Sequence, residues 1–203
     1  YLDRKKHSTT TPKYTFMGFA PVPFSNIELG DLILSKEEVL SIADLCNGTA
    51  FVEERATKAN FLDTIQRYKV IHLSTHADIG YGTDPWIAFR DQKLNLNEIY
   101  ATKNQSDMVV LSACRTSLGE LKQGEGIMSL ARGFFHSGAK SVVSSLWTIN
   151  DKSSKDIMLE FYNGLEQGLT KSAAMQKAKI NYIKKYRTTL TPSYWAGLIV
   201  IGD

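Results

Sequence analysis

A cysteine and a histidine follow two predicted strands and have the chemistry of a nucleophile and a base. Residues 69–74 (KVIHLS) and 108–112 (MVVLS) are short apolar runs typical of buried strands, and they lead into His76 and Cys114. A neighbouring imidazole can take the proton of a thiol and later return it to a leaving amine. The backbone N–H groups of Ala77 and Cys114 are candidate donors to the oxyanion of the tetrahedral intermediate. If the two strands are parallel neighbours, these groups meet at one sheet edge.

The elements that would position this pair alternate between strands and helices. This alternation predicts an α/β layered fold with a mostly parallel sheet and helices on both faces, whose sites form at the carboxyl ends of strands. Ser35 and Glu38 have the spacing of a capping box at the start of one helix. Strands are expected at 14–20, 49–53, 69–74, 86–90, 108–112, 141–147 and 198–201, and helices at 35–44, 57–68, 96–100, 126–136, 151–167 and 170–186.

Composition narrows the classes of function. The chain has 203 residues with 43% hydrophobic side chains and a net charge of +3, so we expect a folded domain, no direct nucleic-acid partner and no membrane span. Two cysteines without a repeated spacing predict neither a zinc site nor a disulfide framework, and we expect no metal and no cofactor. Reduced thiols favour a cytoplasmic location. Cys46 lies on the apolar face of a predicted helix and is interpreted as a structural thiol.

The domain organisation is expected to be simple. Residues 1–13 (YLDRKKHSTTTPK) are polar and without periodicity, and we interpret them as a leader or the end of a fragment. Residues 14–203 form one domain. The polar, Gly-flanked segment 118–126 is either a mobile loop by the site or a solvated turn.

Several ordered blocks of the sequence resemble the CHAT domain, a cysteine peptidase of the caspase-like clan related to separase. These are IHLSTHA, VVLSACRTSLGE, GEGIMSLARGFFHSGAKSVVSSLWTINDKSS and PSYWAGLIVIGD. The resemblance covers about residues 35–203. It implies a caspase-like layered fold and a catalytic dyad of His76 and Cys114, while His72, within its strand, does not match.

The resemblance also implies what surrounds the domain. CHAT domains are usually longer at the N-terminus and are often fused to TPR repeats. The resemblance therefore implies a domain that lacks part of its N-terminal region, and a TPR-containing region or regulatory subunit is an expected partner. Activation by such a partner or by the missing segment follows from the same comparison.

Asp151 has two interpretations. The segment LWTIND (residues 146–151) resembles the separase-type segment in which an Asp lines the pocket for a basic side chain. A carboxylate there would pair with an Arg or Lys of the substrate. Alternatively, Asp151 only caps the helix that starts there.

Three functions are compatible with these residues. The first is a cysteine endopeptidase that cleaves a protein or peptide substrate after a basic residue. The second is a catalytically silent caspase-like interaction module, against which the intact Cys–His pair argues. The third is another acyl transfer through Cys114, for which the sequence shows no acyl-carrier pocket.

Overall fold

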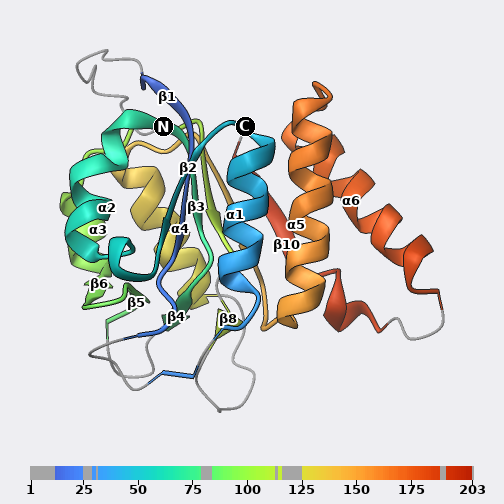
Figure 1. The fold of residues 1–203 in the computed structure, drawn as a ribbon, viewed down its shortest axis with the longest axis horizontal. Coiled ribbons are helices and arrows are strands. Elements are labelled where there is room, and N and C mark those ends of the chain that lie inside the picture. The colour runs from blue at the N-terminus through green and yellow to red at the C-terminus, as the bar shows by residue number, and fades with distance from the viewer. Residues whose placement is uncertain are drawn as a thin grey trace.

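The computed structural model describes residues 12–24, 29–30, 32–78, 84–112, 114–115, 125–187 and 191–202. At residues 14, 114–115 and 125–129 it describes the backbone. Among these parts of the chain, no helix is both long and apolar enough to cross a membrane. Alternating strands and helices build a layered α/β molecule (Figure 1).

A six-stranded sheet runs through the centre in the order β10-β9-β7-β3-β1-β2. The strands β9, β7, β3, β1 and β2 are parallel to one another. In this sheet of the described residues, β10 pairs antiparallel with β9. The predicted mostly parallel sheet is therefore confirmed. The strands are β1 (Tyr14–Ala20), β2 (Thr49–Val52), β3 (Tyr68–Leu73), β7 (Met108–Leu111), β9 (Ser141–Ser145) and β10 (Leu198–Gly202).

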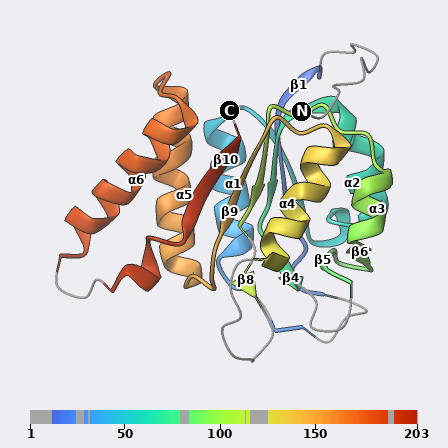
Figure 2. The same ribbon diagram turned by 180° about the vertical axis from the view of Figure 1, so that it is seen from behind.

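Helices cover both faces of this sheet, as Figures 1 and 2 show from opposite sides. Side chains alternate along each strand, so Val109 and Leu111 pack on one face while Met108 and Val110 pack on the other. One face carries α1 (Ser35–Leu45), α5 (Asp151–Glu166) and α6 (Lys171–Lys185), and the other carries α2 (Lys58–Thr64), α3 (Leu96–Ala101) and α4 (Glu125–Ser137).

A second, four-stranded sheet lies at the carboxyl end of the central strands, at the bottom of Figure 1. Its order is β6-β5-β4-β8, with β4 parallel to β8 and the other pairs antiparallel. The short strands β4 and β8 follow β3 and β7 along the chain, so the small sheet extends the central pair of strands. Its bounds are β4 (His76–Asp78), β5 (Trp86–Ala88), β6 (Lys93–Asn95) and β8 (Cys114–Arg115).

Two local sequence predictions were wrong. The predicted capping box at α1 does not form: the N-cap is Leu34, and the Ser35 hydroxyl donates to the Leu32 carbonyl at 2.9 Å. The Glu38 side chain turns inward because it bonds to His72, a buried residue of the central sheet. The predicted helix 57–68 begins as expected, with the Thr57 hydroxyl capping it, but gives way to a 3₁₀ turn after Thr64, before β3 starts.

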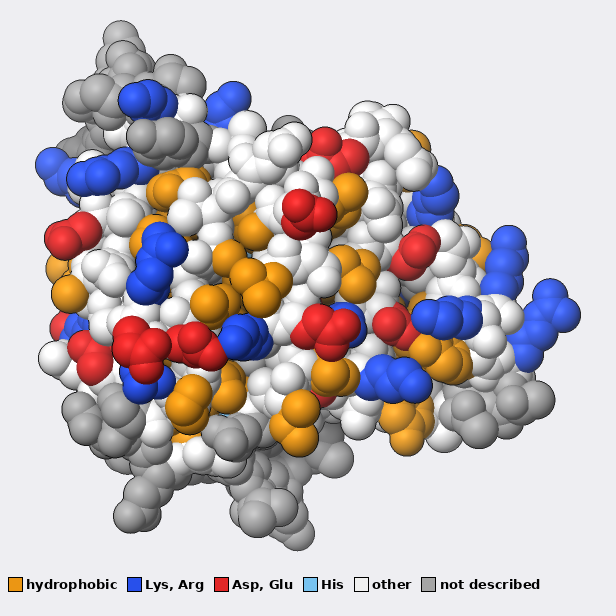
Figure 3. All heavy atoms as spheres, viewed as in Figure 1, with side chains coloured by type: hydrophobic (Ala, Val, Ile, Leu, Met, Phe, Trp, Pro, Cys, Tyr) orange, Lys and Arg blue, Asp and Glu red, His pale blue; other side chains and the backbone are white. Residues whose placement is uncertain are grey.

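The surface that bears α1 and α5 carries interspersed charges, and Figure 3 shows acidic and basic side chains side by side across it. Lys and Arg side chains gather at the α6 end of the molecule. Ion pairs such as Lys155–Glu37, at 2.5 Å, link neighbouring elements on this face.

Candidate active site

The backbone of the small sheet aligns the two predicted catalytic positions. His76 is the first residue of β4 and Cys114 is the first residue of β8. The two strands are parallel, and their register pairs His76 with Cys114 and Ala77 with Arg115. Behind them, β3 and β7 are parallel neighbours in the central sheet, with Leu73 paired to Leu111. His76 and Cys114, far apart in sequence, thus occupy neighbouring positions at the carboxyl edge of the central sheet.

The hydrogen bonds of His76 define its tautomer. Its ring is buried, and Nε2 lies 2.6 Å from the carbonyl oxygen of Gly30. A carbonyl can only accept, so Nε2 carries the proton and, in the neutral ring, Nδ1 presents a lone pair. Nδ1 is buried and has no hydrogen-bond partner among the described residues. The Phe24 ring packs 5.2 Å from the imidazole, centroid to centroid. The His76 ring is therefore held in one orientation, with an unfilled acceptor position at Nδ1.

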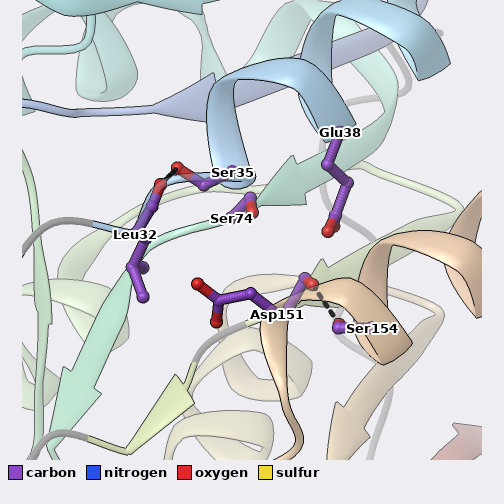
Figure 4. Close-up of a pocket in the computed structure, with 7 residues that line it drawn as sticks. Leu32, Ser35, Glu38, Ser74, Asp151 and Ser154 are labelled. Carbon is purple, nitrogen blue, oxygen red and sulfur yellow. Dashed lines mark hydrogen bonds between the residues drawn. The ribbon is translucent and has the colours of Figure 1, made fainter.

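A small pocket lies beside these strand ends, and Asp151 lines it. Ser74 is two residues before His76, and Ser112 is two residues before Cys114, so the pocket borders both chain segments that lead to the candidate dyad. Figure 4 shows Leu32, Ser35 and Glu38 on one side of the pocket and Asp151 and Ser154 on the other. The accessible volume is about 10 Å³, which is close to the least space that holds a water molecule.

The start of α5 assigns the helix cap to another residue. The N-cap is Asn150, whose side-chain oxygen accepts the Lys152 backbone N–H at 3.1 Å. Asp151 is the first residue of the helix and faces the pocket (Figure 4). Asn150 therefore provides the N-cap hydrogen bond in place of Asp151, while Asp151, in the first turn of the helix, keeps the position where the helix dipole favours a carboxylate.

Behind the pocket, a buried chain of hydrogen bonds joins three elements of the fold. His72, in β3, has no exposed surface and bonds to Glu38 of α1 and Tyr162 of α5. Burial is the main cause that raises the pKa of the Tyr162 phenol well above its ordinary value. The phenol therefore keeps its proton. His72 lies in the packed interior, as expected, and away from the dyad positions.

Cys46 follows the last residue of α1 and has the environment of a structural thiol. It is half-buried against the core beneath α5, and it is the free cysteine whose side chain is described. Burial, together with the nearby Glu166 carboxylate, raises the pKa of Cys46 to about 12. Thiolate is scarce at such a pKa, so Cys46 is a poor nucleophile near neutral pH.

Sequence reasoning did not find two residues of this site. Nothing in a local pattern indicates that the Gly30 carbonyl orients His76, or that Glu38 lines the pocket. The failed capping box was the available signal for Glu38, since a Glu on the apolar side of a helix needs a buried partner.

The segment 118–126 lies mostly outside the described residues. Among the residues that the structure describes, no cluster of three His, Cys, Asp or Glu side chains could hold a metal.

Comparison with known proteins assigns the family. The family model for the CHAT domain matches residues 5–203. The chain belongs to the CHAT domain family. Tetratricopeptide repeat protein 28 from Homo sapiens is 34% identical over 96 residues, which are 47% of this chain and 4% of the human protein. The mouse protein of the same name is 33% identical over the same shares. This CHAT domain thus spans a small part of these relatives.

Solved structures confirm the caspase-like fold. The Arg-specific cysteine proteinase gingipain R has a TM-score of 0.63 at 11% identity, over 93% of this CHAT domain and 46% of the proteinase. Separase, in the Saccharomyces cerevisiae separase–securin complex, has a TM-score of 0.58 at 14% identity, over 94% of this chain and 12% of separase. At these identities the likeness shows the fold alone.

Proposed function

We propose that this CHAT domain is a cysteine endopeptidase that uses Cys114 as nucleophile and His76 as general base. The observation that carries the proposal is the pairing of His76 with Cys114 on adjacent parallel strands, together with the unfilled, buried Nδ1 of His76. A general base needs a free lone pair and a ring held in one orientation. The hydrogen bond from Nε2 to the Gly30 carbonyl holds the His76 ring in that orientation. The caspase-like fold of the family supports the same assignment.

The reaction follows from these groups. Nδ1 of His76 takes the proton of the Cys114 thiol, and the thiolate attacks the carbonyl carbon of the scissile peptide bond. The backbone N–H groups of Ala77 and Cys114 donate to the oxyanion. His76 then gives its proton to the leaving amine, which breaks the C–N bond and leaves a thioester on Cys114. Water, deprotonated by His76, hydrolyses the thioester and restores the thiol.

Specificity for a basic residue before the cut is the second part of the proposal. Asp151 lines a pocket beside the candidate dyad, and Asn150, not Asp151, is the N-cap of α5. Its carboxylate would form a charge-assisted pair with an Arg or Lys side chain.

The proposed partners follow from the relatives. Tetratricopeptide repeat protein 28 carries, by its name, the repeats that often accompany CHAT domains, so a TPR-containing region or regulatory subunit is the proposed activating partner. The substrate is a protein or peptide.

Labelling with an electrophilic peptide tests the chemistry. A peptide acyloxymethyl ketone that ends in Arg should label the wild-type chain at Cys114, and neither Cys114→Ala nor His76→Ala should be labelled. Cys46, with its pKa about 12, serves as an internal control that stays unmodified at pH 7.5 in the folded protein. Labelling of Cys114→Ala equal to wild type would remove Cys114 from the role. Absence of labelling and cleavage in the partner-bound wild type would favour a silent interaction module.

A further inference from the structure

A second carboxylate lines the pocket that contains Asp151. We propose that Glu38 is a specificity-determining residue of this pocket, and that together with Asp151 it selects a guanidinium over an ammonium group. The inference rests on the proposed function, since it concerns the side chain before the cut. It adds a residue from α1, more than a hundred positions from Asp151 in the chain.

The lining of the pocket is anionic and otherwise hydroxylic. Glu38 and Asp151 line it together with the serines 35, 74, 112 and 154 and the apolar Leu32. No Lys or Arg is among these described lining residues. In Figure 4 the Glu38 carboxylate points from α1 toward the side of the pocket that Asp151 and Ser154 form. A carboxylate that is 2% exposed is costly to bury unless cationic or hydrogen-bonding groups meet it.

Inside the protein, the partner of Glu38 is His72. His72 Nε2 donates to Glu38 Oε1 at 2.8 Å, and His72 Nδ1 lies 3.2 Å from the Tyr162 hydroxyl. This arrangement holds the carboxylate in place. A carboxylate has about four lone-pair positions, and His72 uses one of them. The remaining positions can accept from a ligand.

Two carboxylates in one pocket fit an arginine side chain better than a lysine side chain. A guanidinium is planar and presents five N–H donors in a fixed fork, so it can bond to two carboxylates and to serine hydroxyls at once. An ammonium group is compact and strongly hydrated, and it gains less from a second carboxylate in a confined site. Leu32 provides an apolar contact for the methylene stem.

Cleavage kinetics test this inference with a matched control. Two fluorogenic peptides that differ only in Arg or Lys before the cut are compared on wild type, Glu38→Gln and Glu37→Gln, each with its activating partner. Glu37 carries the same charge on the same helix, but its side chain is 59% exposed and pairs with Lys155. Loss of the Glu38 charge should lower kcat/KM about tenfold for Arg and at most about threefold for Lys. Glu37→Gln should leave the Arg/Lys ratio at its wild-type value.

The outcomes separate this inference from the proposed function. If wild type cleaves after Arg and Asp151→Asn does not, while Glu38→Gln keeps the wild-type Arg/Lys ratio, the role of Glu38 is overturned and the peptidase stands. If Glu38→Gln does not fold, Glu38→Asp keeps the charge but withdraws it from the pocket. The ratio should then fall toward one, and an unchanged ratio overturns the inference.

A binding measurement decides the inference if wild type cleaves nothing, in which case the proposed function fails. Butylguanidine and butylamine are titrated into Cys114→Ala and into Cys114→Ala/Glu38→Gln, each bound to its activating partner, with NMR shifts as the readout. Tighter binding of butylguanidine that is lost with Glu38→Gln supports the role of Glu38. Equal binding of the two cations, or no binding, overturns it.

Discussion

At the scale of single residues, two histidines four positions apart have opposite environments. His76 has one ring nitrogen bonded to a backbone carbonyl and the other unfilled, whereas both nitrogens of His72 are occupied. An unfilled nitrogen can accept a proton from a substrate or nucleophile. Two filled nitrogens make the ring part of the packing.

Substitution should separate the two histidines. We expect His76→Ala to abolish cleavage with a small change in the free energy of unfolding, because it removes the proposed base. His72→Ala should lower the free energy of unfolding by about 3 kcal/mol or more, since it leaves the Glu38 carboxylate buried without its donor. Urea unfolding and peptide cleavage on the same preparations measure both effects.

A double variant controls this comparison. In His72→Ala/Glu38→Gln the buried group is uncharged, so part of the lost stability should return. An inactive but fully stable His72→Ala, with an active His76→Ala, would reverse the two roles.

At the scale of secondary structure, the start of α5 divides two tasks between adjacent residues. Asn150 accepts a backbone N–H and caps the start of the helix, while Asp151 faces the pocket. Since the strand before it, β9, ends at Ser145 at the carboxyl edge of the sheet, the helix start lies near the candidate dyad. Helix initiation and the proposed substrate binding can therefore be altered separately.

Two adjacent substitutions should show this division. Asp151→Asn should lower kcat/KM for cleavage after Arg by about a hundredfold or more, as expected for loss of one partner of a buried charge pair. Cleavage after uncharged residues should be mostly spared. Asn150→Ala should reduce the free energy of unfolding by about 1 kcal/mol, without altering preference. A peptide library profiled with both variants is the measurement, and an unchanged profile for Asp151→Asn would refute the pocket assignment.

At the scale of the whole molecule, the pocket is narrow in this structure. Its accessible volume of about 10 Å³ admits no more than a water molecule. Residues from α1, α5 and the segments just after β3 and β7 line it, so a shift of these elements relative to one another would widen it. A partner that binds the open arrangement would stabilise it.

We therefore expect low basal activity from the isolated chain. Cleavage after Arg should rise when the chain is joined to a TPR-containing region or bound to a regulatory subunit, because the open pocket becomes more populated. Steady-state cleavage with and without the partner measures the change. Full turnover by the chain alone would contradict this expectation.

The cytoplasmic location and the domain boundary at residue 14 stay predictions.

The local sequence determined the elements and their order. Periodicity placed the central strands and most helices within a few residues, because an apolar pattern reflects which face of a strand or helix is buried. The residue types at the ends of two strands predicted the positions of His76 and Cys114, and the ordered blocks after residue 70 indicated the CHAT family. These features are encoded in neighbouring residues, so they can be recognised before the chain is folded.

The tertiary structure alone decided which distant residues meet. The pairing of β4 with β8, the bond from His76 to the Gly30 carbonyl and the inward turn of Glu38 join segments that are 34 to 46 residues apart. The capping-box prediction failed for this reason: a local side-chain bond at the start of α1 was replaced by a buried bond to His72. Such contacts depend on how the layers pack, and side-chain spacing along the chain carries no record of that packing.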